Sequence, residues 1–282
     1  MKRPQSNTQD TKQVFRQCGA CSHTFAHILN REFGHPDALA ELALNPLAGG
    51  IMNQGHQCGM IWGAALAVGA ESYRKHKDFY MATAVAVTAT QHLVESFEQR
   101  SNTVNCKEIL GYSISNVFGI VRLMLTTTIK GMENSKCMNL AEDWAPEAIQ
   151  SGRDGLEEDI ELTQKPVSCA SEVVKRMGGS DEEQMMVSGF AGGLGLSGHA
   201  CGALSAAIWM KTLNWCRENP GKLPPYIKNK VTENVLDTFK ELNGSEMLCQ
   251  KITGQHFETI NEHSEFINKG GCKDLIEALA RS

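Results

Sequence analysis

An internal repeat limits the folds open to this chain more than any other feature of its sequence. Residues 47–65 read LAGGIMNQGHQCGMIWGAA, and residues 190–208 read FAGGLGLSGHACGALSAAI, which align without a gap at an offset of 143. Both contain A-G-G, four further residues, and then G-H-x-C-G. Self-similarity at a fixed offset is the signature of a duplicated structural unit. We therefore expect one fold to occur twice along the chain.

The cysteines follow the same repeat. Cys58 and Cys106 are 48 positions apart, and so are Cys201 and Cys249. If these residues were only core filler, we would expect alanine or valine at some of the matched positions. Each half has four cysteines in the same order, which are Cys21, Cys58, Cys106 and Cys137 in the first and Cys169, Cys201, Cys249 and Cys272 in the second. Cys18 and Cys216 have no counterpart.

The length of 282 residues is sufficient for two domains, each large enough to bury a core. We predict a first four-cysteine helical domain over residues 1–152 and a second over residues 164–282. The intervening residues 153–163 contain the acidic cluster Glu157, Glu158, Asp159 and Glu161, which is typical of a solvated linker.

The spacing of apolar residues predicts an all-α fold, with two tandem helical bundles related by a pseudo-twofold axis. Gly-rich loops are expected over 46–57 and 190–199. The stretch MATAVAVTAT within 81–90 would suit a strand in isolation. The expected helices cover 10–33, 37–44, 58–76, 77–99, about 115–130 and 138–150, then 168–177, 181–187, 200–217, 225–242 and the residues after Gly270-Gly271.

Charge and hydropathy exclude several classes of function. The net charge is −5 and no basic run occurs, so nucleic acid is not an expected partner. No apolar run reaches the roughly 18–20 residues that span a bilayer, so membrane insertion is not expected. The basic start MKR is not followed by an apolar segment, which favours the cytoplasm. Thiols stay reduced there, so ten cysteines indicate metal binding or redox chemistry rather than disulfides.

The repeated loop places Cys58 and Cys201 at expected helix starts, where free N–H groups and the helix dipole stabilise a thiolate. Glycines let the backbone wrap closely around a buried anionic group. His56 and His199 stand two residues before these cysteines. Each is a candidate metal ligand, proton donor or hydrogen-bonding partner of a thiolate, and the alternative is a loop histidine bonded to the backbone. The matched loop glycines are Gly49, Gly50, Gly55, Gly192, Gly193 and Gly198.

Four soft thiolates in each half suit an iron–sulfur cluster, zinc or Cu(I). The long spacings require the fold, rather than the local sequence, to gather these ligands. Cys18 and Cys21 form the chain's one CxxC pair and would share a face of a helix; Cys18 is a spare ligand, a resolving thiol or a packing residue. No histidine follows Cys21 directly, so covalent c-type haem, which needs CxxCH, is not expected.

These residues resemble the redox-active protein family named for its C-GCAxxG-C-C cysteine pattern. The first half contains Cys58-Gly59-Met60-Ile61-Trp62-Gly63, and NCKEILGY around Cys106 is similar to the family's third-cysteine segment. In the second half Ala206 replaces the last glycine, and LCQKITGQHF keeps only Cys249 and Gly254. The resemblance covers nearly the whole chain as two copies. It implies a redox role, and a related domain in split-Soret cytochromes, which carry haem and an iron–sulfur centre, supports iron–sulfur binding.

We therefore expect a redox protein whose matched cysteines bind an iron–sulfur cluster or clusters, for electron transfer or for chemistry on a small substrate. Its partner would be an electron-transfer protein or a small molecule, and a homodimer is one assembly open to it. The sequence leaves open whether the chain is an enzyme, and oxidoreductase activity is the enzymatic option. The alternatives are a metal-free dithiol/disulfide oxidoreductase and a non-enzymatic zinc or copper module. Two separate sites and one site shared between the halves both remain open. The better-kept pattern makes the first half the first place to look for chemistry.

Overall fold

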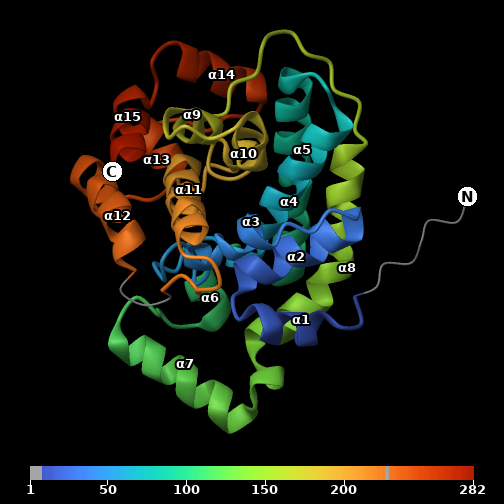
Figure 1. Cartoon of the computed structure of the whole chain (residues 1–282), viewed down its shortest axis with the longest axis vertical. Coiled ribbons are helices and arrows are strands. Elements are labelled where there is room, and N and C mark those ends of the chain that lie inside the picture. Colours follow the sequence, from blue (N-terminus) through green and yellow to red (C-terminus); the bar gives the residue numbers. More distant parts are fainter. Residues whose placement is uncertain (1–7, 226–228) are drawn as a thin grey trace, which may run out of the picture.

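The computed structural model describes residues 8–225 and 229–282, and every regular element within them is a helix (Figure 1). The all-α prediction is confirmed, and MATAVAVTAT lies inside a helix. The first half contains α1 (Thr11–Cys18), α2 (Cys21–Phe33), α3 (Ala38–Leu42), η1 (Asn45–Leu47), α4 (Gly59–Lys75), α5 (Phe79–Ser101), α6 (Cys106–Leu110), α7 (Val117–Lys130), η2 (Met132–Asn134) and α8 (Lys136–Leu156). The second half contains α9 (Cys169–Arg176), α10 (Asp181–Met186), η3 (Ser188–Phe190), α11 (Gly202–Glu218), α12 (Lys230–Asn243), α13 (Cys249–Thr253), α14 (Ile260–Asn268) and α15 (Lys273–Arg281).

The two halves share one hydrophobic core. Helices α4 and α5 pack against α8 on one side and against α10 and η3 of the second half on the other (Figure 1). Trp62 and Phe190, one from each half, are both fully buried and meet edge to face, with ring centroids 4.9 Å apart. The indole N–H of Trp209 donates to the carbonyl of Ala40 at 3.1 Å. The duplicated units are therefore joined through their interiors.

Small residues on α4 bring its neighbours close. A Cβ on Gly63 would lie 2.0 Å from the carbonyl oxygen of Ser22 in α2. A Cβ on Gly69 would lie 2.5 Å from the carbonyl oxygen of Met186 in α10. Both distances are far below van der Waals contact, so a side chain at either position would push the helices apart.

One helix prediction was wrong in a way that affects the site. The stretch 10–33 is not one helix, because α1 ends at Gly19, whose φ of 74° is left-handed and whose N–H caps the carbonyl of Phe15. A new helix begins at Cys21. Cys18 and Cys21 therefore lie on two different helices and do not share a helical face.

Other differences concern short elements and boundaries. The apolar periodicity missed α6 and α13, which are one turn each, and α14. Helix α8 continues to Leu156, so the first residues of the predicted linker complete that helix, and no helix covers 157–168. The helix predicted over 225–242 begins at Lys230; residues 226–228 lie outside the described part of the chain.

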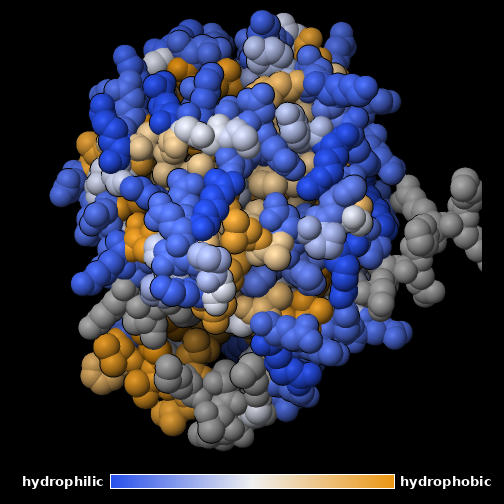
Figure 2. All heavy atoms as spheres, in the orientation of Figure 1, coloured by the Kyte–Doolittle hydropathy of each residue, from blue (hydrophilic) through white to orange (hydrophobic). Residues whose placement is uncertain are grey.

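The visible surface in Figure 2 is largely hydrophilic, with an apolar area at the end where α7 lies. Val117, Phe118, Val121 and Leu125 of α7 are exposed large apolar residues there, and Phe118 is 88% exposed. Among the helices of the described residues, none combines the length and the hydropathy of a membrane span.

Candidate functional site

Every one of the eight matched cysteines lies at the start of a helix. The free N–H groups of a first helical turn, together with the helix dipole, favour negative charge at these positions. Cys21, Cys106, Cys169 and Cys249 are the first residues of α2, α6, α9 and α13; Cys58, Cys201 and Cys272 immediately precede α4, α11 and α15; and Cys137 is the second residue of α8. The helices predicted from the sequence already began at or beside five of these cysteines, and the structure adds Cys21, Cys106 and Cys249.

In the first half, the thiol of Cys58 donates a hydrogen bond to the sulfur of Cys21. This bond lowers the pKa of Cys21, and the backbone N–H of Gly49 supports the same effect. The bond and burial together raise the pKa of Cys58 well above its ordinary value. Within this pair, Cys21 is therefore the sulfur that gives up its proton first.

Cys106 and Cys137 complete the first site. Burial raises the pKa of both, that of Cys137 to about 12, and repulsion from a charged Cys21 acts in the same direction. Both pack within a small apolar cluster that includes Leu110, Ile114 and Leu123. The four thiols of the first half thus lie within electrostatic reach of one another in apolar surroundings.

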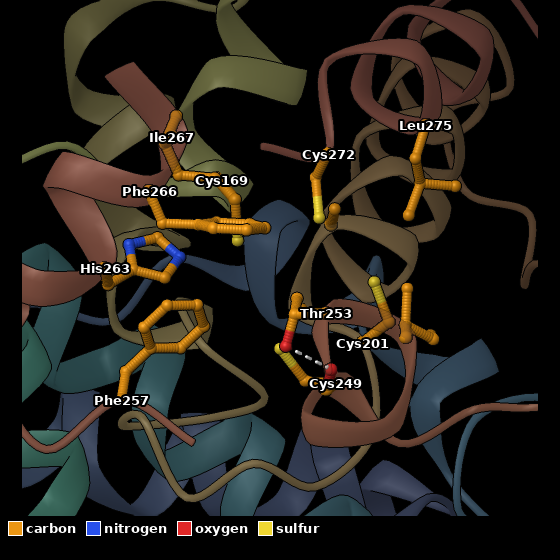
Figure 3. Close-up of a pocket in the computed structure, with 13 residues that line it drawn as sticks. Cys169, Cys201, Cys249, Thr253, Phe257, His263, Phe266, Ile267, Cys272 and Leu275 are labelled. Carbon is orange, nitrogen blue, oxygen red and sulfur yellow. Dashed lines mark hydrogen bonds between the residues drawn. The ribbon is translucent and has the colours of Figure 1, made fainter. Parts of the chain in front are cut away.

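In the second half, all four cysteines line one pocket (Figure 3). Their side chains come from four different helix starts and face the same space. The rest of the wall is apolar apart from two side chains, Thr253 and His263, and the Thr253 hydroxyl donates to the carbonyl of Cys249 at 2.8 Å. The apolar wall includes Ile252, Phe257, Phe266, Ile267 and Leu275.

Burial controls the thiols of this pocket. It raises the pKa of Cys169, Cys249 and Cys272, and that of Cys201 to about 12, although backbone N–H groups at the start of α11 act in the opposite direction on Cys201. A helix start therefore does not make either central cysteine acidic: burial outweighs it at Cys201, while at Cys58 the hydrogen bond to Cys21 is the main cause of the raised pKa and burial adds to it. Loss of hydration destabilises a buried thiolate by more than the N–H groups of the first helical turn stabilise it.

A matched set of backbone hydrogen bonds places the second cysteine of each half beside the third. In the first half, the N–H of Cys58 donates to Val104 O at 2.7 Å, and the N–H of Cys106 donates to His56 O at 2.8 Å. The second half repeats both bonds, from Cys201 to Met247 O at 2.9 Å and from Cys249 to His199 O at 2.5 Å. Cysteines 48 positions apart in the sequence are thereby brought together in both halves.

The Gly-rich loops support the first cysteine of each half. The N–H of Gly49 hydrogen-bonds to the sulfur of Cys21, and the N–H of Gly192 hydrogen-bonds to the sulfur of Cys169. The loop backbone is left-handed over residues 49–53 and 192–196, where every residue has a positive φ. This conformation turns the A-G-G segment toward the cysteine, and it is the reason for the glycines there.

Gly50 and Gly193 have the strictest requirement for glycine in these loops. Both have positive φ, at 77° and 82°. A Cβ at Gly50 would lie 2.4 Å from the backbone nitrogen of His56, and one at Gly193 would lie 2.6 Å from the carbonyl oxygen of His199. The two remaining matched glycines, Gly55 and Gly198, also have positive φ.

His56 and His199 contribute mainly through their backbones. Their carbonyls hold the third cysteines, as described above, while burial lowers the pKa of both imidazoles. Within the described residues neither ring forms a hydrogen bond, and His199 does not line the second pocket. The ring of His56 lies within electrostatic reach of Glu246 from the second half, which places it at the junction of the halves.

Gln57 ties the two loops together. Its side-chain N–H donates to the carbonyl of Gly193 at 3.0 Å, and its side-chain oxygen accepts from the N–H of Ala200 at 2.9 Å. The side chain is fully buried. Since Gln57 precedes Cys58 and Ala200 precedes Cys201, one side chain connects the central cysteine segments of the two sites.

The two unmatched cysteines lie apart from this arrangement. Cys18 ends α1 and is half-buried; burial and nearby Glu41 raise its pKa to about 11. Cys216 is buried near the end of α11, away from the helix starts. All ten cysteines are free thiols.

Within the described parts of the chain, no three His, Cys, Asp or Glu side chains converge in a way that would hold a single metal ion. The four sulfurs of the second site instead surround a common pocket from separate walls. The arrangement differs from the closed tetrahedral site that a structural zinc ion requires.

Nothing in the sequence pointed to His263 as a site residue. It is 1% exposed, lies in α14, and forms part of the pocket wall (Figure 3). Burial lowers its pKa to about 4. The segment between the third and fourth cysteines of the first half contains no histidine, so the repeat could not identify this residue.

One comparison with known proteins gives a match. The family model described as "Putative redox-active protein (C_GCAxxG_C_C)" matches residues 19–149 and again residues 167–282. The two matches together cover most of the chain and correspond to the two halves. No match was found among curated proteins or among solved structures.

Proposed function

This chain belongs to the C_GCAxxG_C_C family of redox-active proteins, and we propose that each of its four-cysteine sites binds an iron–sulfur cluster. The protein would pass electrons to a partner protein or act on a small substrate at a cluster. Its setting would be the cytoplasm, where thiols remain reduced and able to bind metal.

The convergence of four buried or half-buried thiols at helix starts, once in each half, carries this proposal. In the second half the pKa of all four thiols is raised, so four thiolates cannot form there without compensating positive charge. Bound iron supplies that charge, and thiolate is the ligand that iron–sulfur clusters use.

The donor set fits a cluster better than a single ion. In a cluster the thiolates bind different irons, so the sulfurs lie around a common group instead of meeting at one point. The second pocket has this arrangement, and no three side chains in the described residues converge on one ion. The zinc or copper alternative is therefore less well supported.

Within this proposal the chain's own residues have definite roles. The eight helix-start cysteines are the ligands. The N–H groups of Gly49 and Gly192 donate to the sulfurs of Cys21 and Cys169, and hydrogen bonds to sulfur tune a cluster's reduction potential. The apolar walls keep water out. When bound, the cluster supplies one-electron redox chemistry.

Anaerobic purification followed by iron and acid-labile sulfide analysis tests the proposal. We expect a brown protein with iron and sulfide, and about half the iron in Cys58→Ser and in Cys201→Ser. Cys216→Ser is the matched control, because it removes a buried thiol outside both sites. A colourless protein that stays metal-free after anaerobic treatment with iron(II) and sulfide would exclude the proposal.

The hydrogen bond between Cys21 and Cys58 favours a second candidate at the first site, a dithiol/disulfide exchange. The Cys21 thiolate would attack a substrate disulfide, releasing one substrate thiolate and forming a mixed disulfide. Deprotonated Cys58 would then displace the second substrate thiolate. The substrate disulfide is reduced to two thiols while Cys21 and Cys58 are oxidised to a disulfide, and an external thiol reductant restores the pair.

Thiol counting separates this candidate from the first. Under metal-free conditions, alkylation should find two fewer free thiols after treatment with a small disulfide than before it. The missing pair should map to Cys21 and Cys58 in peptide mass spectra. Equal thiol counts in the two samples would rule the exchange out.

A further inference from the structure

His263 presents a free nitrogen to the second pocket. Its Nδ1 lies 3.0 Å from the carbonyl oxygen of Val167. A carbonyl can only accept a hydrogen bond, so Nδ1 carries the proton in the neutral ring, and Nε2 carries the lone pair. The ring extends from α14 toward the space that the cysteine side chains face (Figure 3).

This arrangement matches the way proteins prepare a histidine to bind a metal. Metal-binding histidines donate their other ring N–H to a carboxylate or a backbone carbonyl, which fixes the tautomer and the ring orientation. The carbonyl of Val167 has that role here, two residues before Cys169. The burial that lowers the pKa of His263 also keeps its imidazole neutral, the form that binds metals.

The ring is also held in place. It is 1% exposed and packs edge to face against Phe257, with ring centroids 5.1 Å apart. The next residue, Ser264, accepts the N–H of Val167 at 2.8 Å, so the two polar groups of Val167 are bonded to consecutive residues of α14. The same contacts would also let His263 serve a purely structural role, holding the segment that leads to Cys169. A test must therefore separate that role from metal binding.

We infer that Nε2 of His263 is a nitrogen ligand to iron at the second site, beside the four cysteines of its pocket. This inference rests on the proposed function, because it assigns one more ligand to the same cluster. The first half has no histidine between its third and fourth cysteines. The two clusters therefore differ in chemistry, because only the second adds a neutral nitrogen donor to its thiolates.

Two substitutions separate the two roles. His263→Asn keeps an N–H near the Nδ1 position that can donate to Val167, and it removes the Nε2 nitrogen. Ser264→Ala does the reverse, because it removes one hydrogen bond to Val167 and leaves the imidazole in place.

The measurement is pulsed electron paramagnetic resonance of the full chain, treated anaerobically with iron(II) and sulfide and then reduced. We expect an imidazole ¹⁴N coupling in the wild type and in Ser264→Ala, and its loss in His263→Asn. Growth on ¹⁵N-histidine should change the coupling in the wild-type chain, which gives a readout that needs no variant.

The outcomes distinguish this inference from the proposed function. Full iron and sulfide content without any imidazole coupling overturns the role of His263 and leaves the proposed function standing. A coupling that persists unchanged in His263→Asn also overturns it. A chain that binds no iron overturns both the proposed function and this inference.

Discussion

The two cysteine sites share a backbone scaffold but differ in the surroundings of their sulfurs. Both halves pair the segment before the second cysteine with the segment before the third, and both direct a glycine N–H to the first cysteine. In the first site, Cys21 and Cys58 are hydrogen-bonded and Cys21 has a lowered pKa. In the second, every thiol has a raised pKa and a histidine joins the wall.

This comparison shows which part of a duplicated site can change. The scaffold depends on the loop glycines and on backbone bonds, which both copies retain. The pocket histidine comes from the segment between the third and fourth cysteines, which contains α7 in the first half and α14 in the second. Divergence of that segment changes the wall around the thiols without altering the backbone bonds that gather the cysteines.

The largest expected effect comes from adding a side chain at a loop glycine that both halves share. Gly50→Ala and Gly193→Ala each place a Cβ against the backbone of His56 or His199. We expect each to lower the free energy of unfolding by about 3 kcal/mol, from left-handed strain and overpacking together, and to remove iron from its own site. Denaturant unfolding and iron analysis measure both effects.

Gly254→Ala is the control for this pair. Gly254 also has a left-handed φ, of 74°, but no atom lies within 4 Å of its added Cβ. It should show only the strain, about 1–2 kcal/mol, with full iron content. Equal losses in all three variants would mean that the close approach of the loops is not what supports the sites.

The next effect concerns the histidine that only the second site has. The pKa of His263 is about 4 in the folded chain against an ordinary 6.5. Above pH 6.5 the imidazole of His263 is neutral in both the folded and the unfolded state. As the pH falls toward 4 only the unfolded state takes up the proton, so the folded state loses up to about 3 kcal/mol.

Urea unfolding of the metal-free protein between these pH values measures this loss. In His263→Asn the corresponding part of the pH dependence should disappear, while the contribution of other groups remains. If the two proteins keep the same slope, burial of a neutral His263 is not what couples the second site to pH.

The connection between the sites is the third point of comparison. Gln57→Leu leaves the N–H of Ala200 buried without its partner, while the carbonyl of Gly193 keeps only the Ser197 hydroxyl. We expect a loss of about 2 kcal/mol in the free energy of unfolding. Gln54→Leu is the control from the same loop, because its amide bonds only to nearby Met52. Equal stability of the two variants would argue against a coupled core.

The smallest effect concerns reactivity in the metal-free protein. Iodoacetamide should alkylate Cys21 at least about tenfold faster than Cys169. The reason is that the pKa of Cys21 is lowered and that of Cys169 is raised, and each unit of pKa difference changes the thiolate fraction tenfold. Cys58→Ala removes the hydrogen bond and should slow Cys21 toward the rate of Cys169. Peptide mass spectrometry over time measures both rates, and matching rates in the wild type would contradict the asymmetry.

Much of the site could be predicted because the duplication repeats the same residues at matched positions in both halves. The shared A-G-G and G-H-x-C-G residues identified the loops and the helix starts at Cys58 and Cys201. The matched cysteines identified the eight thiols that the fold then gathers in two groups. Helix class followed from apolar periodicity, while α6 and α13 were missed because a single turn contains no periodicity to detect.

The sequence by itself determined the repeat, the helical class, and which cysteines belong together. Only the tertiary structure decided their acidity, because the Cys21–Cys58 hydrogen bond and the burial of Cys201 depend on neighbours far away in the chain, and they outweigh the helix starts. It also decided that the halves share one core, and that His263 faces the second pocket. These are consequences of long-range packing, which the local order of residues does not specify.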